Sequence, residues 1–324
     1  MLPAPRRGGP GDSFRGFYWG ILARIGVSPY QTRMTASPKS PLDDVLDLLD
    51  LEPIEVNIFR GVSPKDRMQR VFGGQVLGQA LMAAYRTVEN RVCHSLHAYF
   101  LRAGDPKVPI LYEVDRSRDG ASFTSRRVVA IQHGRQIFTL AASFQAVEEG
   151  FEHQFDMPKT PDPETLPQES ELRAQVVDKL PEEERGWFTR PQPIEMRHVE
   201  PVEFFKPRMR PPHQNVWFRA TGKLPDDLSL HQCVLAYASD MTLLDTAMRP
   251  HRVAWFDRNV QIASIDHAMW FHRPFRADEW LLYAQDAPSA SGARGFNRGA
   301  IYKRDGTLIA SVTQEGLMRQ RKPA

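Results

Sequence analysis

The sequence predicts an α+β fold in which one unit, a long helix followed by antiparallel strands, occurs twice along the chain. A helical segment precedes four strand-like segments in each half of the 324 residues. Residues in the two halves also match at a constant spacing of 171 positions. Because the order of elements and the matching residues repeat together, we infer a duplication.

The first 40 residues differ from the rest in composition. They hold five arginines and one acidic residue, Asp12, together with the short apolar run FYWGILARIG at 17–26. We expect a flexible N-terminal extension over 1–40. Three interpretations stay open for it: a targeting arm, a flexible terminus, or a start chosen upstream of Met34.

The first unit is predicted over 41–147. Its beginning, TASPKSPLDDVLDLLDL at 35–51, is typical of a capped amphipathic helix, and FGGQVLGQALMAAYRTV at 72–88 predicts the long helix. The predicted strands are SLHAYFLRA (95–103), PILYEVDRS (109–117), FTSRRVVAIQ (123–132) and QIFTLAASFQ (136–145). Residues 148–190 are rich in acid and proline, which predicts a linker with one short helix near 168–180.

The second unit is predicted over 191–320 in the same order. LHQCVLAYASDMTLLDTAM at 230–248 predicts its long helix. Its predicted strands are QIASIDHAMWFH (261–272), EWLLYAQDA (279–287), RGFNRGAIYKR (294–304) and TLIASVTQEGLM (307–318). Asp305-Gly306 is typical of a hairpin turn, and His133-Gly134 stands at the matching place in the first unit.

The matching residues extend over the early strands of each unit, where HAYFLRAGDPKVPILYEVD aligns with AMWFHRPFRADEWLLYAQD. The pairs are Phe100 with Phe271, Arg102 with Arg273, Leu111 with Leu282, Tyr112 with Tyr283, Asp115 with Asp286 and Arg127 with Arg298. The repeat predicts that the two units share one architecture.

Composition excludes several classes of protein. With 42 basic and 39 acidic side chains mixed along the chain, nucleic acid is not an expected partner. A mean hydropathy of -0.44 and the absence of a long apolar run predict no stable membrane insertion. Cys93 and Cys233 are too far apart in sequence to indicate a disulfide framework or a thiolate metal site, so we expect a cytoplasmic protein without a metal.

Candidate catalytic residues are polar residues at positions where the pattern calls for apolar ones, because G-x-S-x-G, H-E-x-x-H and the phosphate-binding glycine motifs are absent from the sequence. Asp240 borders the apolar face of the helix predicted over 230–248. Burial there would raise its pKa toward that of a useful base. A solvent-facing Asp or one paired with an arginine is the alternative.

Ser264 and Gln314 are candidates for the same reason, because each shares a strand face with apolar residues. A Ser bonded to backbone and a Gln turned to solvent are the alternatives. Together with Asp240 they would form a cage for an attacking water, and none of the three needs to become covalently attached.

Two further groups have more than one interpretation. The histidines His94, His97, His267 and His272 lie in or beside strands without a third ligand, so we expect structural or supporting roles rather than metal binding. Gly73 and Gly74 begin the first long helix, where exposed N–H groups would hold a phosphate or polarise a carbonyl, or where glycine permits close packing. With Gln75 and His267 they form the candidate substrate-binding set.

At several motifs the sequence resembles the acyl-CoA thioesterase II family, the TesB-like thioesterases. The motifs are FRG at 59–61, FGGQVLGQAL at 72–81, FLRAGDPKVPILYEV at 100–114, IDHAMWFHRPFRADEWLLY at 265–283 and QEGLMR at 314–319. The resemblance runs in order from about 42 to 320 and leaves out the first 40 residues.

The resemblance implies a double hotdog fold, in which each half wraps a curved antiparallel sheet around a long helix. It also implies hydrolysis of fatty acyl-CoA without cofactor, metal or covalent intermediate. The family's catalytic Asp, Thr or Ser, and Gln fall on Asp240, Ser264 and Gln314. Serine is one of the family's two choices, and its hydroxyl offers the same donor and acceptor as threonine. We further expect a homo-oligomer that binds acyl-CoA.

Two other functions stay open at the level of sequence. A hotdog hydratase or dehydratase acting on enoyl thioesters would need a histidine paired with an acid, for which His267 is the candidate. A non-catalytic acyl-CoA binding protein would bind ligand without turnover.

Overall fold

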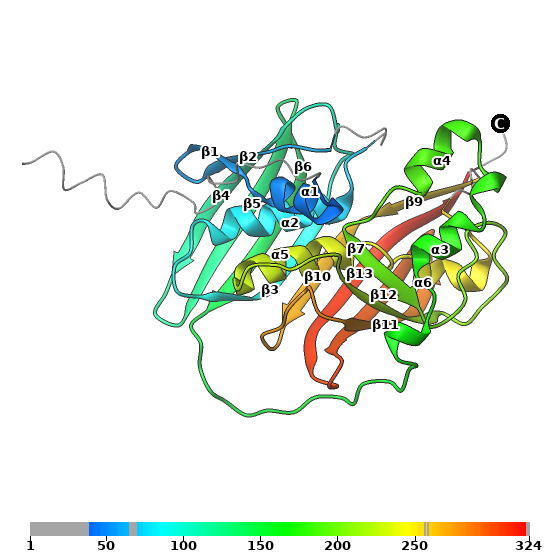
Figure 1. Cartoon of the computed structure of the whole chain (residues 1–324). Helices are drawn as coiled ribbons and strands as arrows, with labels where there is room; N and C mark the ends of the chain where they lie inside the picture. Colours follow the sequence, from blue (N-terminus) through cyan, green and yellow to red (C-terminus); the bar gives the residue numbers. More distant parts are fainter. Residues whose placement is uncertain (1–38, 65–69, 256, 258, 322–324) are drawn as a thin grey trace, which may run out of the picture. The chain divides into compact units, whose positions relative to one another are not determined.

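The computed structural model describes residues 39–64, 70–255, 257 and 259–321 (Figure 1). The extension expected over 1–40 therefore lies outside the described residues except for its last two positions. The first described helix begins where the sequence predicts a cap, because the Ser40 hydroxyl accepts a hydrogen bond from the Asp43 N–H and the Asp43 carboxylate accepts one from the Ser40 N–H.

The described residues of the first half form two helices and six strands. In chain order they are α1 (Pro41–Leu49), β1 (Glu52–Glu55), β2 (Ile58–Gly61), α2 (Gly73–Tyr85), β3 (Val92–Phe100), β4 (Ile110–Asp119), β5 (Phe123–Gln132) and β6 (Arg135–Gln145). The long helix α2 is buried along almost its whole length, which fits its mostly small and apolar residues.

A segment of short helices follows β6, where the sequence predicts a linker with one helix. These helices are η1 (Pro163–Thr165), α3 (Glu169–Ala174), η2 (Val177–Lys179) and α4 (Glu182–Phe188). The linker contacts the second half through Glu169, which lies 2.8 Å from His198 Nε2 on the strand that follows, while Arg173 of the same helix donates to Glu169 at 2.6 Å.

The second half repeats the plan of the first. In chain order it contains β7 (Ile194–His198), β8 (His213–Ala220), α5 (Leu228–Ser239), α6 (Asp245–Met248), η3 (Arg249–His251), β9 (Val260–Ser264), β10 (Asp266–Phe271), β11 (Leu281–Ser291), β12 (Arg294–Lys303) and β13 (Leu308–Gln320). The single strand predicted over 261–272 is interrupted at Ile265, whose N–H bonds to Glu315 and whose carbonyl accepts from Phe100.

All the strands belong to one antiparallel sheet, in the order β1-β2-β4-β5-β6-β3-β10-β13-β12-β11-β8-β7, with β9 added on β13. The halves meet where β3 pairs with β10, and His97 lies opposite Ala268, its counterpart in the repeat. Helices α2 and α5 lie side by side against the sheet (Figure 1). One apolar core includes residues from both halves, so residues from Ser40 onward form a single compact unit.

The strand pairs β1–β2 and β7–β8 were not predicted from the sequence. They extend the sheet at its two outer edges, one pair in each half. Strand β1 is exposed at all four positions, so it lacks the apolar alternation by which a half-buried strand is detected.

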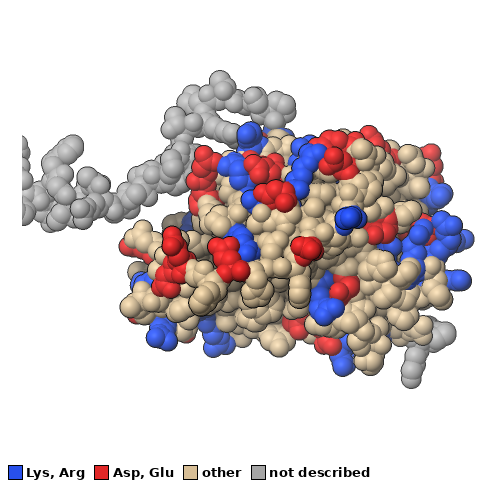
Figure 2. All heavy atoms as spheres, turned by 90° about the horizontal axis from the view of Figure 1, so that it is seen from below, with Lys and Arg blue, Asp and Glu red and all other residues tan. Residues whose placement is uncertain are grey.

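Charged side chains of both signs are mixed on the face shown in Figure 2. Among the described residues on the face shown in Figure 2, lysines and arginines alternate with acidic residues between large uncharged areas. A broad basic surface of the kind that holds nucleic acid is therefore not seen on that face. No helix of the described residues is long and apolar enough to cross a membrane.

Candidate active site

Asp240 lies at the end of α5 rather than inside a long helix. The continuous helix predicted over 230–248 is wrong, because α5 ends at Ser239 and Asp240 is its C-cap. The chain then turns, with Met241 N–H bonding three residues back to Ala238, before the short α6 begins. The turn directs the Asp240 side chain toward the sheet.

Tertiary hydrogen bonds explain why the helix stops there. The amide of Gln214 donates to the backbone carbonyl of Thr242 at 3.0 Å, a carbonyl that a continuous α-helix would use for its own ladder. Gln285 donates to the Thr242 hydroxyl at 2.6 Å and accepts from the Thr246 hydroxyl at 3.0 Å. These four polar side chains are buried and satisfy one another, which favours the turn over helix continuation.

Ser264 and Gln314 both donate to the same carboxylate oxygen of Asp240. The Ser264 hydroxyl lies 3.1 Å from Asp240 Oδ1 and the Gln314 amide nitrogen lies 2.6 Å from it. Ser264 is the last residue of β9, whereas Gln314 is a fully buried residue of β13. The structure thus brings together the three residues that the sequence singled out as catalytic candidates.

Gly73 and Gly74 place the start of α2 against the same carboxylate. A Cβ atom at Gly73 would lie 2.5 Å from Asp240 Oδ2, and one at Gly74 would collide with the Tyr237 carbonyl oxygen. The Gly74 N–H also bonds to the Asp240 side chain. Glycine is therefore needed for close approach, and the first turn of α2 directs its positive end toward Asp240.

Burial raises the pKa of Asp240 to about 6, although hydrogen bonds from Gln314, Ser264 and the Gly74 N–H act in the opposite direction. The side chain keeps some exposure to solvent. At neutral pH it is a carboxylate with more affinity for a proton than an ordinary Asp, which is the property of a general base.

Gln314 also has an acceptor without a partner in the described part of the chain. Since a carboxylate only accepts, the amide nitrogen must face Asp240, and the orientation of the Gln314 side chain is fixed. Its Oε1 is buried and has no hydrogen-bond partner among the described residues. A water held by this oxygen and by Asp240 would be oriented by two acceptors.

Gln75 and His267, the other two predicted binding residues, form hydrogen bonds to other residues of the chain. The Gln75 amide donates to Val62 O at 3.1 Å and to Ser63 Oγ at 2.9 Å, so it fixes the chain that precedes α2. His267 is fully buried on β10, with Nε2 2.9 Å from the Ser239 hydroxyl. Burial lowers the pKa of His267 to about 3, so the ring is neutral.

Two supporting residues were missed in the sequence. Asn297 lies opposite Gln314 in the sheet and its side chain bonds to Gln314 O at 3.3 Å and to the Ala247 N–H at 3.0 Å. Tyr283 donates to the Ser239 carbonyl at 3.2 Å, next to Asp240. Both are buried polar residues in strands, the same signal that identified Gln314.

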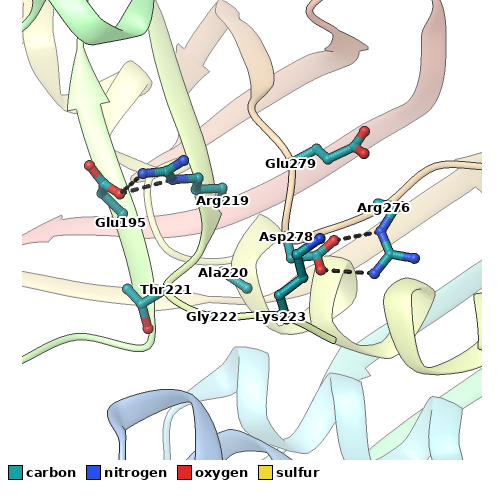
Figure 3. A pocket seen from close by; sticks show the side chains of 9 residues that line it. All are labelled: Glu195, Arg219, Ala220, Thr221, Gly222, Lys223, Arg276, Asp278 and Glu279. Carbon is teal, nitrogen blue, oxygen red and sulfur yellow. Dashed lines mark hydrogen bonds and ion pairs between the residues drawn. The ribbon is translucent and has the colours of Figure 1, made fainter. Parts of the chain in front are cut away.

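A pocket of about 300 Å³ lies elsewhere, between β7, the end of β8 with the residues that follow it, and the loop that precedes β11 (Figure 3). Its charges are largely paired, since Arg219 binds Glu195 at 2.8 Å and Arg276 binds Asp278 at 2.9 Å. Asp240, Ser264 and Gln314 do not line it. The described residues also contain no cluster of three or more His, Cys, Asp or Glu side chains arranged to hold a metal ion.

Known proteins resemble the chain in both halves. A family model described as acyl-CoA thioesterase matches residues 185–317, and one described as acyl-CoA thioesterase N-terminal domain matches 63–145. Acyl-CoA thioesterase 2 of Haemophilus influenzae is 42% identical over 279 residues, which cover 86% of this chain and 98% of that protein. Acyl-coenzyme A thioesterase 8 of Rattus norvegicus is 44% identical over 287 residues, covering 86% and 89%.

Solved structures of acyl-CoA thioesterases and of hotdog-fold proteins are also similar to the chain. Acyl-CoA thioesterase II TesB2 from Mycobacterium marinum superposes with a TM-score of 0.71 at 44% identity, covering 86% of this chain and 99% of that one. A hotdog-fold protein from Alicyclobacillus acidocaldarius gives a TM-score of 0.68 at 21% identity, which bears on the fold alone. The predicted double hotdog fold is confirmed, and the chain belongs to the acyl-CoA thioesterase family.

Proposed function

We propose that the chain hydrolyses fatty-acyl-CoA thioesters with a water activated by Asp240 and oriented by Gln314 and Ser264. The observation that carries the proposal is that two donors converge on one oxygen of a partly buried carboxylate whose pKa is raised to about 6. Such a carboxylate is held in one orientation and still has affinity for a proton.

In this reaction Asp240 takes one proton from the water while the water oxygen attacks the thioester carbonyl carbon. The carbonyl oxygen becomes an oxyanion, which the N–H groups of the first turn of α2 would stabilise. Collapse of the tetrahedral intermediate breaks the carbon–sulfur bond, and the departing thiolate receives the proton from Asp240. The products are a fatty acid and free CoA, and no covalent enzyme intermediate forms.

The hydratase alternative gains no support from the surroundings of His267. That reaction would need the imidazole to be paired with an acid, whereas its ring bonds to the Ser239 hydroxyl and is fully buried. A binding protein without turnover would not require a carboxylate of raised pKa beside a buried amide. Hydrolysis is therefore the function that these contacts favour.

Thiol release from acyl-CoAs of short to long chain tests the proposal. Asp240→Asn keeps the shape of the side chain and removes the base, so we expect a rate lower by about 10² to 10⁴-fold. Asp245→Asn is the matched control, because burial also raises the pKa of this nearby carboxyl, to about 7, but it bonds to Trp255 instead. Equal activity in wild type and Asp240→Asn would contradict the assignment.

We further propose that residues 41–147 form the first hotdog unit, 148–190 the linker and 191–320 the unit that carries the catalytic residues. The matched ranges 63–145 and 185–317 support these limits. The cytoplasmic location and the homo-oligomer stay predictions. Fractionation of cells and light scattering of the purified chain would test them.

A further inference from the structure

A second pocket, of about 630 Å³, lies at the opposite end of the α2–α5 pair from Asp240. Its walls come from the C-terminal end of α2, the segment that leads into β3, the chain just after β6 and the start of α5. These are the elements that would be expected at a symmetry-related copy of the candidate active site.

The two halves are related by an approximate two-fold axis. Helix α2 begins at Gly73 and α5 begins at Leu228, 155 residues later. Gly78 and Cys233, which are also 155 apart, face each other, since a Cβ at Gly78 would lie 3.1 Å from Cys233 O. In the sheet, His97 lies opposite its counterpart Ala268. Equivalent residues that face each other across antiparallel elements define such an axis.

The axis assigns a counterpart to each residue near Asp240. At the helix spacing of 155, Asp240 corresponds to Tyr85, and Gly73 corresponds to Leu228. Tyr85 and Leu228 both line the second pocket. The pocket therefore lies where the two helices place the counterpart of the active site.

The sheet residues of the site have counterparts as well. Ser264 corresponds to Cys93 at the spacing of 171. Gln314 corresponds to Ala142, because Arg126 lies opposite Ala142 as Asn297 lies opposite Gln314. The spacing is one residue longer there, as it is between the turn residues Gly134 and Gly306.

The second pocket lacks the groups needed for hydrolysis. Tyr85 replaces the carboxylate, and its hydroxyl donates to Gln232 and accepts from the Cys93 N–H at 2.8 Å. Burial raises the pKa of Tyr85 and of Cys93 well above their ordinary values, so both side chains are neutral. A ligand that enters this pocket would find neither a carboxylate nor an ionised side chain at the positions equivalent to Asp240 and Ser264.

The lining combines apolar walls with positive charge. Met82, Val88, Val92 and Leu228 supply apolar surface, and Arg86 and Arg91 lie among them. Arg91 donates to three backbone carbonyls, those of residues 120, 121 and 122, and within the described chain no carboxylate is paired with it.

The pocket lining also includes one acidic residue, Asp227, whose partners are neutral donors. The Asp227 carboxylate accepts from the backbone N–H of Ser229 at 2.9 Å and from its hydroxyl at 2.6 Å, as an N-cap does. Arg86 is paired with Asp50 at 2.7 Å, whereas Arg91 is held by backbone carbonyls and forms no ion pair among the described residues, so Arg91 is the cation we assign to an anion. The volume lies within the range of small-molecule sites.

We propose that this pocket is a second, non-hydrolytic site that holds an acyl chain with an anionic head group, either a free fatty acid or acyl-CoA. The choice of ligand rests on the proposed function, because substrate and product of that reaction are the amphiphilic anions the protein would meet. The acyl chain would lie along the apolar walls and the head group beside Arg91.

Calorimetric titration with dodecyl-CoA thioether, which has no carbonyl to hydrolyse, counts the sites. We expect about two equivalents per wild-type chain and about one for Val88→Trp, in which the indole fills the second pocket. Val56→Trp is the matched control, because Val56 is exposed at the turn between β1 and β2. Thiol release from dodecanoyl-CoA by Val88→Trp should stay within about twofold of wild type.

Titration with dodecanoate separates the two sources of the head group. If the fatty acid alone fills the second site, Arg91→Gln should weaken its binding about tenfold, the effect of one charged hydrogen bond. Arg116→Gln, in the exposed end of β4, is the matched control and should have no effect. If only the thioether fills the site, the ligand is acyl-CoA.

A measurement on the unaltered chain guards against a variant that fails to fold. A photoreactive diazirine dodecanoate should label peptides from 82–92 or 227–229 in wild type. One equivalent of thioether per chain together with no labelling of these peptides overturns the second site. Thiol release by the same protein reports on the proposed function separately, so failure of one proposal is distinguishable from failure of the other.

Discussion

At the scale of single residues, the pKa of Asp240 predicts the pH dependence of catalysis. Burial raises that pKa to about 6, and the proposed base works only when deprotonated. The rate, kcat/KM, should therefore rise with pH through about 6 and level off above it. Ser264→Ala removes a donor that stabilises the carboxylate, so the midpoint should move to higher pH. A midpoint near 4, typical of an ordinary Asp, would contradict this assignment.

Substitutions at Gly73 and Gly74 should differ in their effects on activity and on stability. A Cβ at Gly73 would lie 2.5 Å from Asp240 Oδ2 and 3.0 Å from the Phe100 ring, two side chains that can shift. Gly73→Ala should therefore lower activity about 10²-fold with little change in melting temperature, since a small misplacement of a catalytic group is enough. Gly74→Ala collides with the backbone carbonyl of Tyr237 and should lower the melting temperature as well.

Activity assays and thermal melts of both variants test this difference. Gly186→Ala in α4 is the control, because nothing lies within 4 Å of a Cβ placed there. Full activity in Gly73→Ala would show that the start of α2 need not touch the carboxylate.

At the scale of elements, the break between α5 and α6 depends on its buried amides. The Gln285 amide now bonds to the Thr242 hydroxyl, the Thr246 hydroxyl and the Gln214 amide. Gln285→Leu would remove this shared partner from all three groups. Each unsatisfied buried group costs about 1–3 kcal/mol, so we expect the free energy of unfolding to fall by at least about 2 kcal/mol. Denaturant unfolding measures it, and an unchanged midpoint would contradict a structural role for this network.

The same break shows what the sequence could and could not predict. Apolar periodicity predicted a helix up to Met248, because Val234, Leu244 and Met248 keep helical phase across the turn. The hydrogen bonds that stop α5 join Thr242 to Gln214 and Gln285, which are distant in sequence, so local pattern carries no information about them.

At the scale of the whole molecule, the repeat predicted two copies of one architecture, but it did not predict how they join. The spacing of 171 does not by itself predict that β3 pairs with β10. Nor does it predict that the first turn of α2 in one half lies against Asp240 of the other half. Polar residues in apolar phase identified Asp240, Ser264 and Gln314 one at a time. Their convergence on one carboxylate oxygen follows from the joined sheet, which no local window contains.

Because the two halves share one sheet and one core, an intact linker should not be needed to keep them together. Phe151 and Phe155 are exposed, and the chain from Ala146 to Asp162 has no helix or strand, so a protease site inserted near Gly150 should be cut without unfolding. Because the two halves share the β3–β10 pairing and one apolar core, the cut fragments should stay together in size-exclusion chromatography.

The cut protein should also keep thioesterase activity, since Gly73 and Gly74 come from one fragment and Asp240, Ser264 and Gln314 from the other. The uncut protein carrying the same insertion is the control. If the fragments separate and activity is lost, the covalent linker, rather than the shared sheet and helix pair, holds the site together.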